Sequence, residues 1–231
     1  MDVFRPAFVP DPDMGRDAML SLQHRIRDAA VFSGSPATDT VIGVDQGLDG
    51  DIMVSHAVVW RDGGVVDHVV AREPVRTPYM PGLLSFREGS SIISCLEKVE
   101  VEPDCVLFDG SGRIHYREAG LATHIGVVFD VPSLGVAENL LCGEIGAEPP
   151  FAEERVVPVT ADSSVETVAD GEVMGFACQT RQYSGGSRHI NPVYVSSGHR
   201  VGGEEAVGVV RGLCGSWKLP DPLHVADRRA S

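Results

Sequence analysis

The stretch TVIGVDQGLDGDIMVSHAVVWRDGGVVDHVVAREPV, residues 40–75, decides the fold that the sequence predicts. It contains three runs rich in β-branched residues, at 40–47, 52–60 and 65–75, and the turn Arg-Asp-Gly-Gly separates the second run from the third. Runs of this kind, bounded by Asp and Gly, are typical of β-strands joined by short turns. We therefore expect a meander of three consecutive strands.

Amphipathic helices are predicted on both sides of this meander. Residues 13–31 carry apolar side chains at four-residue steps, and Asp13 is a candidate N-cap. Residues 90–99 and 120–129 have helical patterns as well. The last helix is expected at residues 203–213.

Strands alternate with the helices in the second half of the chain. Apolar runs at 105–110 and 132–138 predict two strands, and the segments 171–181 and 192–197 predict a strand pair. An irregular excursion is expected at 139–154. Alternation after a meander favours an α/β fold, a mixed sheet with helices on both faces. A length of 231 residues suits a single domain over residues 1–231.

The charge balance is strongly acidic. The chain has 33 Asp and Glu against 19 Lys and Arg, a net charge of -14, and only Lys98 and Lys218 are lysines. Nucleic-acid-binding proteins usually carry a basic surface, so this balance alone argues against a polyanionic partner. A surface adapted to concentrated salt and an ordinary acidic protein are the two interpretations. In the salt-adapted case, the total charge says little about the active-site cleft.

The cysteines and the N-terminus predict a cytoplasmic protein. Five cysteines are scattered without a C-x-x-C pair, which disfavours a disulfide framework or a zinc site and favours burial as small apolar residues. The N-terminus lacks the basic start and apolar run of a signal peptide, and no apolar stretch reaches the length of a membrane span. We expect a soluble chain with no membrane partner.

Two acids close predicted strands. Asp45 follows the apolar run at 40–44, and Asp109 follows the run at 105–108. An Asp before a turn often only caps it, which is the ordinary interpretation of either residue alone. Two such acids in one sheet indicate a shared cluster, because ligand sites gather at strand ends and crowded carboxylates favour a hard cation such as Mg²⁺. Glu88 is a third candidate, or else a surface acid at a helix start.

Four sequence blocks carry a family resemblance. They are PYMPGLLSFREG (78–89), LFDGSGRIHYREAGLATHIGVVFDVPSLGVAE (107–138), PVYVSSGHRV (192–201) and KLPDPLHVAD (218–227). In this order they resemble the endonuclease V family, the deoxyinosine 3′-endonucleases. The resemblance implies an RNase H-like fold and a DNA repair enzyme, which hydrolyses a phosphodiester one bond 3′ to a deaminated base, mainly deoxyinosine, with a divalent metal.

The resemblance also implies roles for the acids and histidines. Asp45, Glu88 and Asp109 match the family's acidic triad and would hold Mg²⁺ or Mn²⁺, as one ion or two. His115 matches a histidine near the catalytic centre and is expected to be catalytic, and the alternative is a histidine that only caps its loop. Two further histidines match as well: His124 is expected to pack or orient, and for His199 a phosphate contact and loop support are equal alternatives. The other expected phosphate contacts are Arg87 and Arg117.

Recognition of the lesion is expected from the block at 78–89. By resemblance, a rigid strip would insert where the deaminated base leaves the stack, and a neighbouring pocket would receive that base. The strip consists of Pro78, Tyr79, Met80 and Pro81. The pocket residues are Gly82, Leu84, Gly110 and Leu121. The alternative for the strip is a buried loop that only staples the fold.

Glu138 departs from the family pattern, which has a lysine at this position near the scissile phosphate. Three alternatives follow. A cation such as Arg87, Arg117 or Arg181 replaces the lysine, Glu138 joins the catalytic carboxylates, or the enzyme is slow. Two hypotheses thus stand: an active nuclease on deoxyinosine-containing DNA, and a weakly active or non-catalytic binder of inosine-containing DNA or RNA. In either case the chain is expected to be a monomer.

Overall fold

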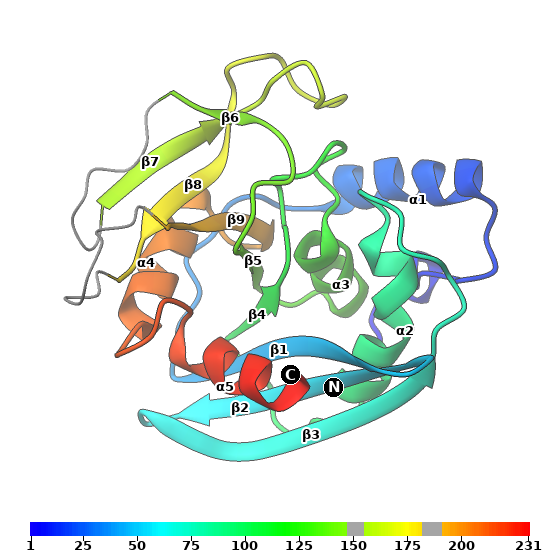
Figure 1. The fold of residues 1–231 in the computed structure, drawn as a ribbon, viewed down its shortest axis with the longest axis vertical. Helices are drawn as coiled ribbons and strands as arrows, with labels where there is room; N and C mark the ends of the chain where they lie inside the picture. The colour runs from blue at the N-terminus through cyan, green and yellow to red at the C-terminus, as the bar shows by residue number, and fades with distance from the viewer. Residues whose placement is uncertain (147–154, 182–190) are drawn as a thin grey trace.

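The computed structural model describes residues 1–146, 155–181 and 191–231, and its centre is one sheet (Figure 1). The strand order in this sheet is β3-β2-β1-β4-β5-β9-β8-β7-β6. The strands are β1 (Thr40–Asp49), β2 (Ile52–Arg61), β3 (Gly64–Pro74), β4 (Cys105–Asp109), β5 (Ser133–Ala137), β6 (Glu144–Ile145), β7 (Arg155–Thr160), β8 (Val173–Gln179) and β9 (Val193–His199).

The predicted meander is present. Strands β1, β2 and β3 pair antiparallel in sequence order, while β4 pairs parallel with both β1 and β5. The remaining pairs, from β5 through β9, β8 and β7 to β6, are antiparallel. The sheet is therefore mixed, as the sequence predicts.

Helices cover both faces of the sheet, which confirms the predicted fold class. The helices are η1 (Pro6–Phe8), α1 (Arg16–Ala29), α2 (Leu84–Leu96), α3 (Leu121–Phe129), α4 (Gly203–Leu213) and α5 (Asp221–Ala230). Helices α2 and α3 pack on one face, and α4 and α5 pack on the other. Helix α1 forms an outer layer against α3, and Figure 1 shows α5 lying over β1 and β2.

The alternation of side chains in β1 explains how one strand serves two cores. Ile42 and Val44 point into the core under α2 and α3, whereas Val41 points into the core under α4 and α5. All three are fully buried. Since successive side chains in a strand point to opposite faces, Gly43, Asp45 and Gly47 share the α5 face with Val41.

Four expectations about the elements need correction. Asp13 is not a helix cap, because α1 begins after Gly15, whose backbone is extended. Helix α2 begins at Leu84, well before residue 90, so it includes Glu88. Strand β7 and helix α5 were not predicted. Within the expected excursion, β6 forms a short strand and residues 147–154 lie outside the described residues.

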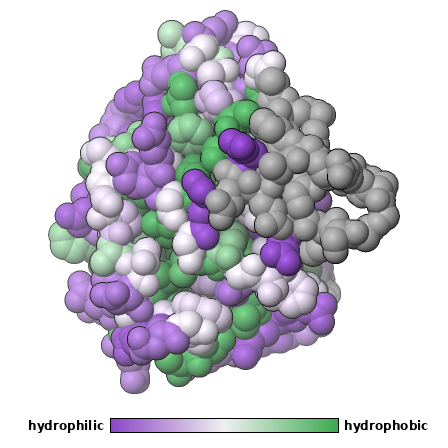
Figure 2. Space-filling model, turned by 90° about the vertical axis from the view of Figure 1, so that its left-hand side faces the viewer, coloured by the Kyte–Doolittle hydropathy of each residue, from purple (hydrophilic) through white to green (hydrophobic). Residues whose placement is uncertain are grey.

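The face of the molecule that Figure 2 shows carries many polar residues. Hydrophilic residues cover most of the coloured surface in Figure 2, with hydrophobic residues between them. Four cysteines, Cys95, Cys105, Cys142 and Cys178, are buried in the core, as expected of small apolar residues. Among the described residues, no helix has the length and apolar character needed to cross a membrane.

Candidate active site

Two carboxylates meet where β1 and β4 run parallel. The register pairs Val44 with Phe108, so Asp45 and Asp109 are the next residues along the two strands. Val41, four residues before Asp45, and Leu107, two residues before Asp109, lie in the core under α5. Since every second side chain of a strand points to the same face, both acids point toward that helix. The two acids are therefore side by side. Asp109 ends β4 as predicted, whereas Asp45 does not end its strand, because β1 continues to Asp49.

Helix α5 brings a third carboxylate, Asp227, to this pair. Oxygen atoms of Asp45, Asp109 and Asp227 all lie within 4.8 Å of one another. The helix can approach because β1 has glycines on this face. A Cβ at Gly43 would lie 2.4 Å from the Pro222 backbone, and one at Gly47 would lie 1.9 Å from the Ala230 carbonyl oxygen. Glycine is therefore required at these two positions, where the α5 backbone comes closest to the strand.

Asp227 was not among the predicted site residues, although its segment carried a signal. Pro222 stands in the first turn of α5, next to Asp221, and both are ordinary helix-start residues. Leu223 and Ala226 are buried at a helical spacing. The helix was predictable from this pattern, whereas its position over β1 depends on the tertiary structure.

Glu88 reaches the same region from α2. Burial, together with the nearby negative charges of Asp45 and Asp109, raises its pKa to about 8. Glu88 does not belong to the three-residue group with oxygens within 4.8 Å, but its coupling to both aspartates places it beside that group. We refer to Asp45, Glu88, Asp109 and Asp227 as the carboxylate cluster.

Repulsion inside the carboxylate cluster fits a divalent cation. Burial raises the pKa of Asp45 to about 6, with a smaller contribution from Asp227. The pKa of Asp109 is raised to about 7 by burial, then by the charges of Asp45, Glu138 and Asp227. Crowded carboxylate oxygens are the donors that Mg²⁺ and Mn²⁺ prefer, and a bound cation would relieve their repulsion. The residues present thus suit the expected metal without identifying it.

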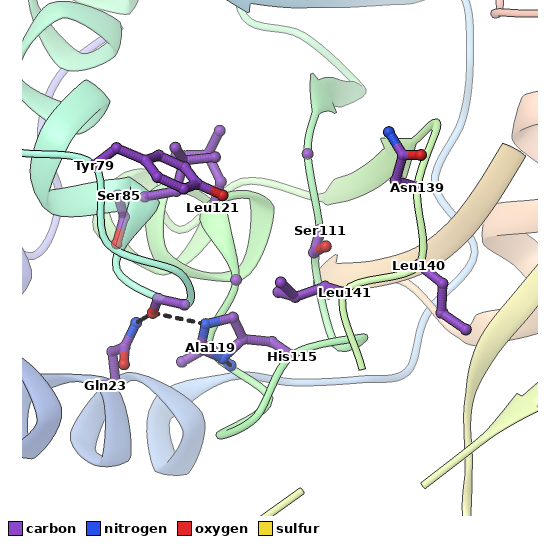
Figure 3. A pocket seen from close by; sticks show the side chains of 14 residues that line it. Gln23, Tyr79, Ser85, Ser111, His115, Ala119, Leu121, Asn139, Leu140 and Leu141 are labelled. Carbon is purple, nitrogen blue, oxygen red and sulfur yellow. Dashed lines mark hydrogen bonds between the residues drawn. The ribbon is translucent and has the colours of Figure 1, made fainter. Parts of the chain in front are cut away.

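A pocket of about 340 Å³ adjoins the carboxylate cluster. Its size lies at the lower end of the range for small-molecule sites. All the residues expected to shape a base pocket line it: Gly82, Leu84, Gly110 and Leu121. Figure 3 shows Tyr79 over Leu121 on one side, with Ser111 and Leu141 on the other.

The Gly82 carbonyl is fixed by two buried side chains, as the dashed lines in Figure 3 show. Gln23 Nε2 donates to this oxygen at 2.7 Å, and His115 Nε2 lies 2.9 Å from it. The other ring nitrogen of His115 accepts from the Arg117 N–H at 3.1 Å. His115 is therefore neutral, and burial lowers its pKa to about 4. This geometry favours support of the pocket over the catalytic role that was expected.

The proline strip, residues 78–81, lies on the surface beside the pocket. Pro78, Tyr79 and Pro81 are exposed, and the Tyr79 side chain is 64% accessible. Met80 is half-buried against the core between α1 and α2. The structure thus describes an exposed strip with one anchor, which disfavours the alternative of a buried loop.

The expected phosphate contacts differ in accessibility. Arg87 is half-buried next to Glu88, and its Nη1 donates to the Thr77 carbonyl at 2.9 Å. Arg117 is buried and bonds to Gln23 and Glu166 at 2.7 and 2.6 Å. Its guanidinium therefore supports the pocket wall and does not face solvent.

The other two histidines named by the resemblance, His124 and His199, are buried within the fold. His199 Nδ1 accepts from the Val31 N–H at 3.2 Å, and Nε2 lies 3.0 Å from Asp130. This arrangement favours loop support over a phosphate contact. His124 contacts the Ser85 hydroxyl and the Phe8 carbonyl, both at 2.8 Å, which agrees with a packing role.

Glu138, where a lysine was expected, follows β5 at the rim of the carboxylate cluster. Its side chain is 54% exposed, and Oε1 accepts a hydrogen bond from Lys218 Nζ at 3.0 Å. The Glu138 charge contributes to the raised pKa of Asp109, whereas Lys218 lowers that pKa. Glu138 thus meets a cation that was not among the expected substitutes.

Comparisons with known proteins agree with this arrangement. The chain is 50% identical to Endonuclease V of Natronomonas pharaonis over 240 residues, covering 100% of this chain and 96% of that protein. The solved endonuclease V of Bacillus subtilis superposes with a TM-score of 0.85 at 27% identity, covering 100% of this chain and 95% of that one.

A third relative was solved with nucleic acid. Ciona intestinalis Endonuclease V, in complex with a 24mer DNA containing an inosine followed by a ribo-adenosine, is 25% identical with a TM-score of 0.74, covering 93% of this chain and 95% of that one. The Endonuclease V family model matches residues 21–228. The chain belongs to the endonuclease V family.

Proposed function

We propose that this chain is a divalent-metal-dependent DNA repair endonuclease that recognises deoxyinosine and hydrolyses the phosphodiester one bond 3′ to it. One observation carries the proposal: helix α2 and strand β4 each contribute to both the pocket and the carboxylate cluster. On α2, Leu84 lines the pocket and Glu88 lies one turn further along. At the end of β4, Gly110 lines the pocket directly after Asp109. If the pocket holds a base, the sugar-phosphate backbone of that nucleotide would therefore lie beside the carboxylates.

The carboxylate cluster would hold Mg²⁺ or Mn²⁺. Asp45, Asp109 and Asp227 are the closest set of oxygen donors, and Glu88 stands next to them. A bound cation would polarise the scissile phosphate and lower the pKa of the attacking water. The chain's own part is to keep the donors in place, which the packing of α5 on β1 and β4 achieves.

The pocket would receive the displaced hypoxanthine. Its wall includes main-chain groups at Gly82 and Gly110, both with positive φ. Such groups can distinguish a base edge that differs from adenine by one oxygen and one ring N–H. The proline strip would fill the gap left in the duplex, and its two prolines limit the entropy lost on binding.

Cleavage of a duplex with a single deoxyinosine tests the proposal. The purified chain is incubated with Mg²⁺ or Mn²⁺ at several KCl concentrations up to molar, because the acidic composition favours a salt-adapted enzyme. We expect one nick 3′ to the inosine, with none in the same duplex carrying adenine. If the chain binds the duplex but leaves no nick under any metal and salt condition, the proposed nuclease activity is refuted.

The second candidate function is a weakly active or non-catalytic binder of inosine-containing nucleic acid. It is favoured by Glu138, which adds a negative charge close to Asp109. An otherwise identical substrate with inosine in RNA distinguishes a preference for RNA from one for DNA. We further propose that the chain acts as a monomer in the cytoplasm, and light scattering with and without the duplex tests the oligomeric state.

A further inference from the structure

Lys218 occupies an unusual position for a lysine. It lies in the connection between α4 and α5, and only 15% of its side chain is exposed. Lysine is seldom buried without a partner, because its ammonium loses hydration. Here Nζ donates to Glu138 Oε1 at 3.0 Å and to Asn191 Oδ1 at 2.9 Å. Three segments far apart in the sequence therefore build this position.

The backbone at Lys218 is held as firmly as its side chain. The Thr180 hydroxyl donates to the Lys218 carbonyl at 2.5 Å. The preceding Trp217 stacks on His224 of α5, with ring centroids 4.3 Å apart and planes 19° apart. These contacts fix the direction of the lysine relative to the helix that carries Asp227.

The ammonium is near the carboxylate cluster. The strand register pairs Asp109 with Val136 of β5, and Glu138 follows two residues after Val136. The Glu138 Oε1 atom that accepts from Lys218 Nζ at 3.0 Å therefore brings the ammonium to the end of β4 that carries Asp109. On the other side of the cluster, Arg87 precedes Glu88 on α2, and its Nη1 donates to the Thr77 carbonyl at 2.9 Å. One cation thus flanks the α2 side of the cluster, and Lys218 flanks the β5 side.

The bonds of Lys218 leave it able to bind an anion. An ammonium has three N–H donors, and those to Glu138 and Asn191 account for two in the described part of the chain. Glu138 is 54% exposed, so it holds the lysine from the solvent side. A preorganised donor of this kind stabilises negative charge that develops on a phosphate oxygen.

We propose that Lys218 contacts a non-bridging oxygen of the scissile phosphate, and that Glu138 with Asn191 positions it there. The inference rests on the proposed function, and it names Lys218 as the side-chain cation that contacts the scissile phosphate in that reaction. In this role Lys218 donates a hydrogen bond and forms no covalent bond. Glu138 is then a positioning residue for Lys218, and neither a base nor an additional metal ligand.

Single-turnover cleavage of the inosine duplex tests this assignment. Lys218→Met should lower the cleavage rate about 100-fold, the range seen on removing one preorganised donor. Lys218→Arg should retain more activity than Lys218→Met, and Glu138→Gln should lose about fivefold, because Asn191 still orients the lysine. The exchange of both residues, Glu138→Lys with Lys218→Glu, should recover at least about tenfold over Lys218→Met.

The matched control is the other lysine of the chain. Lys98 bonds to the Val70 carbonyl at an exposed position after α2, outside the site. Lys98→Met should cut at the wild-type rate. A Lys218→Met rate within about threefold of wild type overturns the proposal, given that the loss expected is that of a transition-state donor.

A binding measurement separates this proposal from the failure of the proposed function. Affinity for the inosine duplex is measured against KCl concentration with Ca²⁺ in place of Mg²⁺. Loss of one phosphate contact should reduce the slope of log K against log salt by about 0.9 in Lys218→Met, with no change in Lys98→Met. If the wild type binds without cutting, the proposed function fails and the slope alone decides for or against Lys218. An unchanged slope refutes the contact.

Discussion

The carboxylate cluster and the pocket share helix α2 and the end of strand β4, but their electrostatics are opposite. In the carboxylate cluster, Asp45, Glu88 and Asp109 have raised pKa values because burial and like charges oppose ionisation. In the pocket, Gln23 and His115 are neutral and satisfied by hydrogen bonds. The carboxylates of the cluster repel one another, whereas Gln23 and His115 in the pocket have hydrogen-bond partners.

This difference teaches how the site divides its work. A cluster of unrelieved charges destabilises the free protein, but it binds a cation more readily for that reason. A pocket that must distinguish two similar bases needs fixed donors and acceptors instead, since a loose wall gives little discrimination. The shared elements α2 and β4 keep the two regions in register.

The largest expected effect comes from removing one charge of the cluster. Asp109→Asn should lower the cleavage rate at least about 1,000-fold and make the metal-free protein more stable by about 1 kcal/mol, because a buried like charge disappears. Cleavage assays and denaturant unfolding in EDTA measure the two effects.

The control for Asp109→Asn is Asp28→Asn, which removes the same charge where the side chain is 75% exposed. It should change neither quantity appreciably. If Asp109→Asn cleaves at a rate within about tenfold of wild type, the assignment of the cluster is wrong, because removal of a metal ligand should reduce the rate much further.

The second effect concerns His124, a buried histidine that contacts Ser85 in the pocket wall. Burial lowers the pKa of His124 to about 4, below its ordinary value of 6.5. The unfolded chain therefore binds more protons, so the contribution of His124 to stability is present above pH 6.5 and is lost as pH falls toward 4. Between pH 7 and 5 this loss is about 2 kcal/mol.

Denaturant unfolding at pH 7 and pH 5 checks this sign. His124→Gln should show a smaller loss of stability over this range than wild type, because its side chain does not titrate. The carboxylate cluster titrates in the opposite direction, so the difference between the two proteins, rather than either curve alone, isolates His124. Parallel curves for wild type and His124→Gln would contradict the prediction.

The sequence predicts the chemistry of the cluster better than its membership. Asp45 and Asp109 could be found because apolar runs end at them, and the parallel register then sets them side by side. Asp227 lies 182 residues after Asp45 in a helix whose position depends on the contacts of Gly43 and Gly47. No local pattern encodes that distance.

The partner of Glu138 could not be predicted for a similar reason. Glu138 alone indicates a lost cation, and the arginines were natural substitutes. Lys218 becomes relevant only when β5 and the connection before α5 are adjacent, since Nζ and Oε1 then lie 3.0 Å apart. Pocket residues were easier, because the resemblance named Gly82 and Gly110 and the fold brought them together.

A third prediction tests whether the pocket acts separately from the cluster. Gln23→Leu removes a donor to the Gly82 carbonyl and leaves Arg117 Nε without its acceptor. Affinity for the inosine duplex should fall about tenfold, because the wall loses its fixed geometry. The metal concentration for half-maximal cleavage should stay the same, and a matching change in that concentration would show that the two regions are coupled.

The smallest expected effect belongs to the proline strip, which lies outside both regions. Tyr79→Ala should weaken binding of the inosine duplex about fivefold, the lower end of what one aromatic contact with a base contributes. Stability should not change, because the side chain is 64% exposed. Phe4→Ala is the matched control, since Phe4 is 66% exposed at a position away from the pocket. Equal affinities of the two variants in a fluorescence titration would remove Tyr79 from lesion recognition, and recognition would then depend on the pocket alone.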